Sequence, residues 1–158
     1  MSDKCDAMIL IPSTVGEVER RAAIRESWLN DLYSHYDGRD FRLKHMFVFG
    51  KAKGLADKGV AGRGSPGAID TATATAMEAD LSLEMEEFGD ILVFPFVDNY
   101  SNLTVKVGLM IKWAAAQDCK LVFKIDSDVF IYSHKFVDLI EKIPSSGPVY
   151  GGHSDSFL

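Results

Sequence analysis

Short apolar runs alternate along this chain with longer segments of helical periodicity, and this alternation limits the possible folds more than any other feature. The runs predicted to be strands are 8–11, 45–49, 90–96, 121–125 and 148–151. Continuously apolar runs such as MILI at 8–11 are typical of strands that are covered on both faces. Strands that alternate with helices predict an α/β fold, in which a mostly parallel sheet has helices on both sides. We expect strand 8–11 to lie beside strand 121–125 and parallel to it, as in the usual 3-2-1-4 order.

Helices are predicted between these strands, at 17–36, after an N-cap at Asp70, from about Leu103, and at 133–143. Helical spacing predicts which side chains face the core. In the helix after Asp70 they are Met77, Leu81, Met85 and Phe88. In the helix from Leu103 they are Leu103, Val107, Met110, Ile111 and Ala114. The glycine-rich segment 51–68 is predicted to be a loop, and Pro95 is expected to end or bend the strand that contains it.

Length and composition limit the class of protein. The 158 residues are enough for one domain and too few for two, so we expect 1–158 to form a single domain. An apolar fraction of 47% with a charged fraction of 25% excludes a disordered chain. The net charge of −6 disfavours nucleic acid and anionic membranes as partners. No run approaches the roughly 20 apolar residues of a membrane span, and no signal peptide precedes the first strand, so a complete chain would be cytoplasmic.

Two cysteines, Cys5 and Cys119, are too few for a disulfide scaffold. Each stands just before one of the two strands that we expect to be neighbours. Neighbouring strands lie about 4.8 Å apart and a disulfide needs Cα atoms within roughly 7 Å, so the cysteines are expected to lie close together. A bond between them would indicate a secretory origin, whereas free thiols would suit the cytosol.

In parallel sheets of this kind, ligands bind at the carboxyl ends of the strands. The polar residues at those ends are Ser13 and Thr14, Asp98, and the triplet Asp126-Ser127-Asp128. Two carboxylates on a rigid edge suit Mg²⁺ or Mn²⁺, which take oxygen ligands and keep positions open for substrate phosphates. The triplet therefore predicts a site for a metal-bridged diphosphate.

Other classes of protein also contain a D-x-D triplet, and often the two aspartates only cap the following helix. An EF-hand loop that starts at Asp126 would need Gly at its sixth position and Glu at its twelfth. Those positions hold Ile131 and Val137, which excludes that class. A phosphatase of the haloacid-dehalogenase type also begins with D-x-D after a strand, but it usually has Thr or Val where this chain has Phe130. It also carries the triplet on its first strand, so it remains the weaker alternative.

Several cationic residues lie on the predicted helices that follow these strand ends. Arg20, Arg21 and Arg25 belong to the first helix, and Arg21 and Arg25 share one face because they are four residues apart. Their guanidinium groups could bind a phosphate or a carboxylate. Composition alone favours a solvated basic face for them and a surface position for Lys106.

Four segments in a fixed order resemble the β-1,3-glycosyltransferase family, which includes galactosyltransferases, N-acetylglucosaminyltransferases and the Fringe enzymes. Segment 21–28 (RAAIRESW) matches R-x-x-I-R-x-[ST]-W, and 47–50 (FVFG) resembles F-x-x-G. Segments 87–92 (EFGDIL) and 96–106 (FVDNYSNLTVK) resemble E-[YF]-x-D-I-[LI] followed by D-F-x-D-x-Y-x-N-L-T-x-K. Segment 124–130 (KIDSDVF) matches K-x-D-D-D-V-F. Each match is modest alone, but the four together, over about residues 8–152, are highly specific.

The resemblance implies a Rossmann-like GT-A fold and an inverting transfer of a hexose from a UDP-sugar to a glycan or glycoprotein acceptor. It also implies a divalent metal, usually Mn²⁺. The resemblance places such an enzyme in the Golgi lumen, held to the membrane only by an anchor that this chain lacks.

Site residues follow from the positions that match the motifs. The resemblance implies that Arg21, Arg25 and Lys106 belong to the donor site. It also implies that Asp128 is the preferred metal ligand, that Asp126 is a donor or metal contact, and that Ser127 between them belongs to the donor site.

This chain departs from the family pattern at two points that bear on function. Ser127 stands where the family has the middle aspartate of its triplet, which removes a charge beside the donor. The acidic motif that carries the family's catalytic base lies beyond the segments matched here, so this chain looks like the donor-binding front part of a catalytic domain. Either it belongs to such an enzyme, or it is a non-catalytic nucleotide-sugar-binding module or an inactive paralogue.

Overall fold

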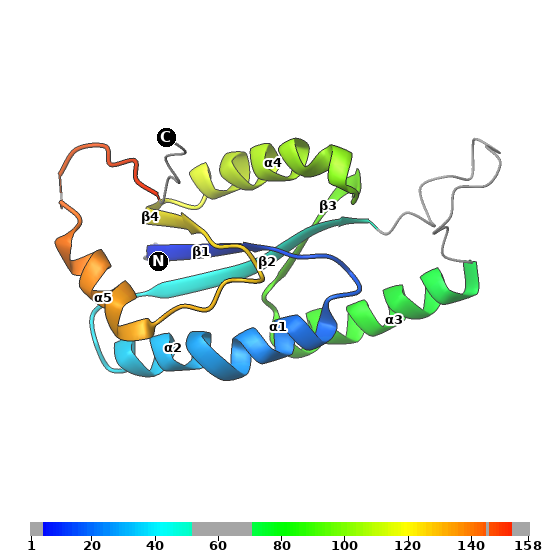
Figure 1. Cartoon of the computed structure of the whole chain (residues 1–158), viewed down its shortest axis with the longest axis horizontal. Helices are drawn as coiled ribbons and strands as arrows, with labels where there is room; N and C mark the ends of the chain where they lie inside the picture. The colour runs from blue at the N-terminus through cyan, green and yellow to red at the C-terminus, as the bar shows by residue number, and fades with distance from the viewer. Residues whose placement is uncertain (1–4, 52–70, 145, 153–158) are drawn as a thin grey trace, which may run out of the picture.

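The computed structural model describes residues 5–51, 71–144 and 146–152 (Figure 1). Most of the glycine-rich segment 51–68 and the predicted N-cap Asp70 lie outside these residues. Lys51 is described, and it is the last residue of a strand rather than the start of a loop. In the described part of the chain, no helix is long and apolar enough to cross a membrane.

The described strands form one parallel sheet in the order β3-β2-β1-β4. Their bounds are β1 Cys5–Pro12, β2 Leu43–Lys51, β3 Ile91–Val97 and β4 Cys119–Lys124. The helices are α1 Val18–Ile24, α2 Asn30–Tyr36, α3 Thr71–Phe88, α4 Leu103–Ala115 and α5 Ser133–Lys142. The predicted α/β class, the strand order and the parallel pairing of β1 with β4 are all confirmed.

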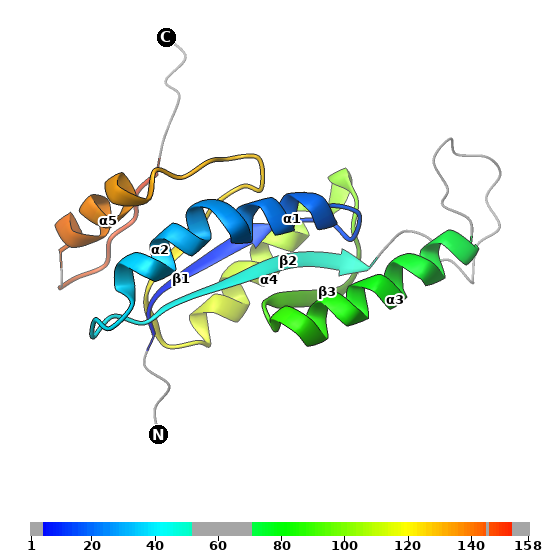
Figure 2. The same ribbon diagram turned by 90° about the horizontal axis from the view of Figure 1, so that it is seen from below.

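Helices cover both faces of the sheet. Helices α1, α2, α3 and α5 lie on one face and α4 lies on the other (Figures 1 and 2). Side chains of β1 alternate between the two cores because successive residues of a strand point to opposite faces. Ala7, Ile9 and Ile11 pack in the core under α1, α2 and α5, whereas Met8 and Leu10 pack against α4. As predicted for a central strand, β1 is buried along almost its whole length.

The predicted helix 17–36 is interrupted by a π-helical turn, η1, at Arg25–Leu29. Ser27 within it has a non-helical backbone, with φ −108° and ψ −113°. The carbonyl of Trp28 accepts a hydrogen bond from the Ser133 hydroxyl at 3.3 Å, which ties this turn to the start of α5. Trp28 itself is buried in the core.

The predicted buried faces of α3 and α4 were wrong in part. In α3, Leu81 is buried as expected, but Met85 and Phe88 are exposed and Glu84 is buried in their place. In α4, Met110 and Ala114 are buried as predicted. Leu103 and Ile111 are exposed, and Lys106 completes the buried face. In both helices a charged residue has a partner in the interior, so it occupies a position that periodicity assigned to an apolar side chain.

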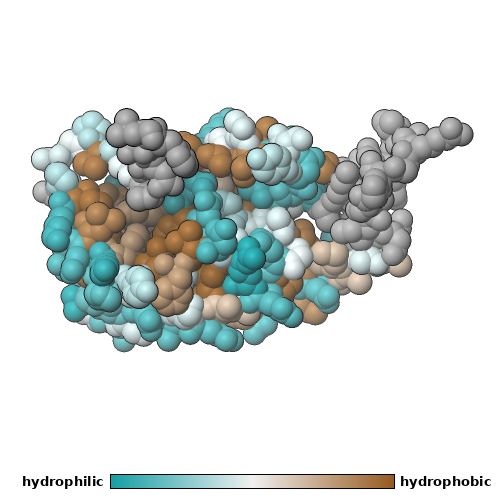
Figure 3. Space-filling view, in the orientation of Figure 1, coloured by the Kyte–Doolittle hydropathy of each residue, from teal (hydrophilic) through white to brown (hydrophobic). Residues whose placement is uncertain are grey.

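The edges of the sheet differ from the prediction at two places. Pro95 does not end its strand. The pairing of β2 with β3 is irregular between Gly50 and Lys51, and Pro95 can be accommodated because β3 is an edge strand of the described sheet. The predicted strand 148–151 is wrong, because these residues pair with none of the described strands. At the other edge Val122 of β4 is exposed, and Figure 3 shows apolar side chains on this side of the molecule.

Cys5 and Cys119 form a disulfide bond across β1 and β4, with their Cα atoms 4.6 Å apart. The two residues are direct register partners, so the predicted proximity is confirmed. The bond joins positions 114 residues apart in sequence. In the chain-entropy model, closing so long a loop destabilises the unfolded chain by about 4–5 kcal/mol.

Candidate functional site

The triplet Asp126-Ser127-Asp128 lies at the carboxyl end of β4, next to the end of β1. The amide of Ile125 donates to the carbonyl of Leu10 at 3.0 Å, so the two strands stay paired up to the triplet. A turn follows, in which the amide of Val129 donates to the carbonyl of Asp126 at 3.1 Å. The side chain of Asp126 is 57% exposed and contacts the ammonium group of Lys124, and Asp128 is also exposed.

Two exposed carboxylates on a rigid edge have the donor chemistry that Mg²⁺ and Mn²⁺ require. Among the described residues, no group of three or more His, Cys, Asp or Glu side chains could hold a metal ion. A metal ion at this triplet would therefore take at most two carboxylate ligands from the described chain. That fits an open site, where substrate phosphates and water complete the coordination.

Beside the triplet, the loop after β1 is held by hydrogen bonds from several directions. The amide of Ser13 donates to the carbonyl of Val48 at 2.9 Å, which extends the pairing of β1 with β2. One carboxylate oxygen of Glu17 accepts from the amide of Thr14 at 2.9 Å and from the hydroxyl of Ser13 at 3.0 Å. These contacts fix the backbone at the point where the fold predicts a ligand.

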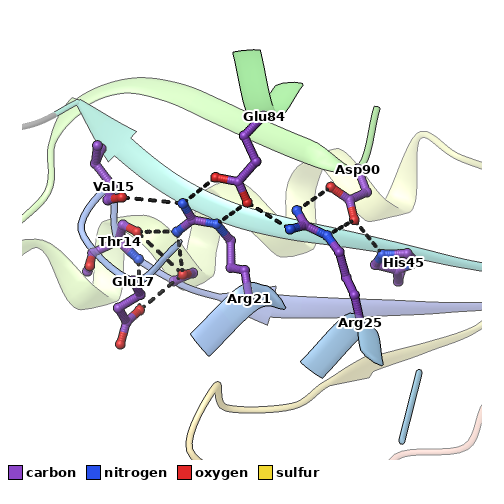
Figure 4. A network of polar contacts seen from close by, with 9 residues as sticks. Thr14, Val15, Glu17, Arg21, Arg25, His45, Glu84 and Asp90 are labelled. Carbon is purple, nitrogen blue, oxygen red and sulfur yellow. Dashed lines mark hydrogen bonds and ion pairs between the residues drawn. The ribbon is translucent and has the colours of Figure 1, made fainter. Parts of the chain in front are cut away.

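Arg21 is fully buried and joins this loop to α3 (Figure 4). Its guanidinium group pairs with both carboxylate oxygens of Glu84, at 2.8 and 2.6 Å. The same group donates to the carbonyls of Thr14, at 2.5 Å, and Val15, at 3.3 Å, and to the Ser13 hydroxyl at 3.2 Å. Arg21 therefore lies behind the loop and acts on its backbone.

Arg25 extends the same network toward β3. It makes two hydrogen bonds of 2.8 Å to Asp90 and a third of 2.8 Å to Glu84 (Figure 4). Its guanidinium carbon lies 4.0 Å from the centre of the Phe88 ring and 4.8 Å from that of Phe47. Arg25 thus has two carboxylate partners and two aromatic neighbours.

Asp90 also contacts the imidazole of His45, whose Nε2 lies 2.8 Å from a carboxylate oxygen of Asp90. The other ring nitrogen, Nδ1, lies 2.7 Å from the hydroxyl of Tyr33. Burial alone raises the pKa of the Asp90 carboxyl, but the hydrogen bonds and charges of His45 and Arg25 outweigh it and lower the pKa to about 2. Burial, with the charge of Asp90 nearby, raises the pKa of Tyr33 to about 12. Burial also raises the pKa of the Glu84 carboxyl, but the hydrogen bonds and charges of Arg21 and Arg25 outweigh it and lower that pKa.

Lys106 holds the loop from the opposite face of the sheet. It is buried in α4, and its ammonium group donates to the carbonyl of Ser13 at 2.9 Å and pairs with Asp98 at 2.7 Å. The other oxygen of Asp98 accepts from the amide of Gly50 at 3.0 Å. Lys106 therefore connects the carboxyl ends of β1, β2 and β3.

The structure brings Arg21, Lys106 and the triplet to the carboxyl ends of the strands, whereas Arg25 pairs with Asp90 at the start of β3. These residues have two kinds of surroundings. Asp126 and Asp128 are exposed at the edge, and Ser127 is half-buried there. Arg21, Arg25 and Lys106 have internal carboxylate partners instead. A direct contact between these three cations and a donor stays a prediction.

Two carboxylates of this region, Glu84 and Glu17, were missed by sequence reasoning. Glu84 had one available signal, since two arginines four residues apart on a buried face need a carboxylate opposite them. Glu17 had none, yet its side chain accepts from the amide of Thr14 in the loop after β1. Arg20 was considered with the cations of the first helix but was not assigned to the donor site, and it donates to the hydroxyl of Ser127 in the triplet.

Comparison with known proteins shows the family to which this chain belongs. A family model described as Galactosyltransferase matches residues 69–156, more than half of the chain. The chain is 30% identical to a UDP-GlcNAc:betaGal beta-1,3-N-acetylglucosaminyltransferase 9 of Bos taurus, over 85% of this chain and 31% of that protein. It is 32% identical to the beta-1,3-galactosyltransferase brn of Drosophila melanogaster, over 78% of this chain and 30% of that protein. It is 29% identical to beta-1,3-galactosyltransferase 1 of Mus musculus, over 89% of this chain and 36% of that protein.

The chain thus spans about a third of the length of these curated relatives. The match of the family model includes α3, β3, α4, β4, the triplet and α5. By this match, the chain belongs to the galactosyltransferase family.

Proposed function

We propose that this chain is the donor-binding part of a metal-dependent, inverting β-1,3-glycosyltransferase, which transfers a hexose from a UDP-sugar to a glycan or glycoprotein acceptor. The observation that carries the proposal is the exposed pair Asp126 and Asp128 at the carboxyl end of β4, in a chain of this family. The names of the relatives include both N-acetylglucosaminyl- and galactosyltransferases, so the proposal covers both sugars.

Asp128, with Asp126 beside it, would hold Mn²⁺ or Mg²⁺. When bound, such an ion supplies the positive charge that stabilises the departing diphosphate. The protein's own residues shape the rest of the donor site. Arg21 and Lys106 hold the loop of Ser13 and Thr14 from opposite sides, and Arg25 fixes Glu84, which in turn orients Arg21.

In an inverting transfer, an acceptor hydroxyl attacks the anomeric carbon from the side opposite the diphosphate and gives its proton to a carboxylate. We assign that role to none of the described residues. The side of the reaction that these residues serve is the binding and orientation of the donor.

The disulfide between Cys5 and Cys119 supports a place for the protein in an oxidising compartment, because such bonds form and persist there. Together with the family, it favours the Golgi lumen. A glycan acceptor would be met in the same compartment.

Thermal unfolding tests this proposal. UDP with Mn²⁺, at about a hundred times the dissociation constant, should stabilise the protein by about 2.7 kcal/mol. For a chain of this size, that corresponds to a rise in melting temperature of about 5–10 °C. Mn²⁺ alone and uridine alone serve as controls, and no shift with UDP plus Mn²⁺ would refute the proposal.

A second candidate is a nucleotide-sugar-binding module that transfers nothing. Ser127 favours it, because the family pattern has a third carboxylate at that position. Both candidates predict UDP binding. Only the enzyme converts a UDP-sugar and a β-galactoside acceptor into UDP and an extended glycan, which chromatography of the products would detect.

A further inference from the structure

Arg20 belongs to α1 but lies on the open side of the edge, away from the buried network of Arg21. Its side chain is 49% exposed. One guanidinium nitrogen donates to Glu17 at 2.8 Å and to the hydroxyl of Ser127 at 3.4 Å. Arg20 thereby links the loop after β1 to the triplet, across 107 residues of sequence.

The charge of Arg20 is much less neutralised than the charges of the cations behind it. Arg21 has a bidentate partner in Glu84, and Lys106 has a buried partner in Asp98. The carboxylate partner of Arg20 is Glu17, in an exposed pair, and Glu17 also accepts hydrogen bonds from the loop. Exposed pairs of this kind are weak and exchange readily for a better partner.

Ser127 has a direct effect on this arginine. The middle residue of the family's triplet is an aspartate, and a carboxylate at this position would pair with the Arg20 guanidinium. The serine hydroxyl offers a hydrogen bond without a charge. The substitution therefore leaves positive charge at the edge, between the two carboxylates of the triplet and Glu17.

We infer that Arg20 is the residue that contacts the diphosphate of the donor directly, with its guanidinium group on the phosphate oxygens. The planar fork of arginine matches phosphate geometry and forms strong, charge-assisted hydrogen bonds. In this arrangement Arg21, Arg25 and Lys106 position the loop, and Arg20 supplies the exposed cation. The inference rests on the proposed function, since it assumes a nucleoside diphosphate at this edge.

Titration calorimetry with UDP, in saturating Mn²⁺, tests the inference. Arg20→Gln should weaken UDP binding about tenfold, the effect of losing one hydrogen bond to a charged group. Its melting temperature without ligand should stay within about 1 °C of the wild type, because the side chain is exposed. Arg39→Gln is the matched control, since it removes the same charge from an exposed position beyond the end of α2 and should leave UDP binding unchanged.

Arg20→Lys distinguishes a ligand contact from a structural role. If Arg20→Lys loses part or all of its affinity for UDP at an unchanged melting temperature, the result agrees with a direct contact. The size of that loss then measures how much the planar guanidinium group contributes. UDP binding by Arg20→Gln within twofold of the wild type would overturn the inference while leaving the proposed function intact. A loss accompanied by a clearly lower melting temperature in both variants would also overturn it, because Arg20 would then act through Glu17. If the wild type itself binds no UDP, the proposed function fails first.

Discussion

Two arginines, two carboxylates and a histidine meet in the interior between α1, α3 and the sheet. Arg21 is fully buried and pairs with the buried Glu84. Arg25 pairs with the buried Asp90. Burying such charges is costly, so each of them depends on its partners remaining in place. At the scale of single residues, this network supports the loop of Ser13 and Thr14 and makes that loop sensitive to changes in α3.

Glu84→Gln tests how far the network depends on this carboxylate. The substitution keeps the size of the side chain but leaves Arg21 and Arg25 with one buried negative charge fewer. Because an uncompensated charge stays in the interior, we expect a loss of about 3–5 kcal/mol in the free energy of unfolding. Urea denaturation measures it, and Glu86→Gln, exposed on the same helix, should cost less than about 0.5 kcal/mol. Similar stabilities for the two variants would contradict this account.

The low pKa of Asp90 gives the folded state a dependence on acid pH. Its ordinary pKa is 3.8 and its pKa in the folded protein is about 2, so the folded state favours the ionised carboxylate. The resulting stabilisation is complete above about pH 4 and is lost as the pH falls toward 2. The difference in unfolding free energy between the wild type and Asp90→Asn should therefore shrink from pH 5 to pH 2.

Urea denaturation across that range would show the change, with the exposed Asp31→Asn variant as a control. A difference between the wild type and Asp90→Asn that stays constant from pH 5 to pH 2 would contradict the assigned contacts of Asp90.

The sequence alone predicted which cationic residues belong to this region but not whether they are buried or which partners they have. Arg21 and Arg25 were correctly placed on one helix face, yet composition favoured a solvated face. The deciding fact is the position of Glu84, which lies 63 residues away from Arg21. No local pattern specifies a partner at such a separation.

At the scale of elements, β2 and β3 approach each other closely where the strand pairing becomes irregular. A Cβ atom added at Gly50 would lie 2.6 Å from the carbonyl oxygen of Phe96 and 2.9 Å from its ring. The amide of Gly50 also donates to Asp98, which pairs with Lys106. Gly50 thus permits the contact between β2 and β3 that supports Lys106 in the first turn of α4.

Gly50→Ala and Gly108→Ala should change stability in opposite directions. At Gly50 the added methyl group forces the strands apart, which should cost about 1–3 kcal/mol. At Gly108, within α4, a Cβ meets no atom within 4 Å, and replacing glycine in a helix should stabilise the protein by about 0.5–1 kcal/mol. Thermal or urea unfolding of both variants checks the pair, and a neutral Gly50→Ala would contradict the close packing described here.

Strands and helices were predicted well where the signal is apolar and local, and poorly where a charge is buried. The predicted runs 8–11 and 45–49 lie within β1 and β2. The run 121–125 lies within β4 except for its last residue. The interior positions of Glu84 and Lys106 could not be predicted from periodicity, because it assigns charged residues to the outside. The run 148–151 has the composition of a strand, but a strand also needs a neighbour to pair with.

For the whole molecule, the order of the strands followed from their alternation with helices, and the disulfide between Cys5 and Cys119 joins the two strands whose ends form the site. The same topology brings the loop after β1 to the triplet after β4. Chain alternation thus predicted where the candidate site lies, while the contacts inside it required the structure.

The central claim is that Asp128 holds a metal ion that binds together with the donor's diphosphate. The protein carries a net charge of −6 and two carboxylates at this edge, so UDP and Mn²⁺ should each bind weakly alone and more tightly together. The most direct test is titration calorimetry of UDP, with and without Mn²⁺, on the wild type and on Asp128→Asn. We predict that Mn²⁺ tightens UDP binding at least tenfold in the wild type and has no such effect in Asp128→Asn. An unchanged dependence on Mn²⁺ in that variant would place the metal site elsewhere and contradict the account.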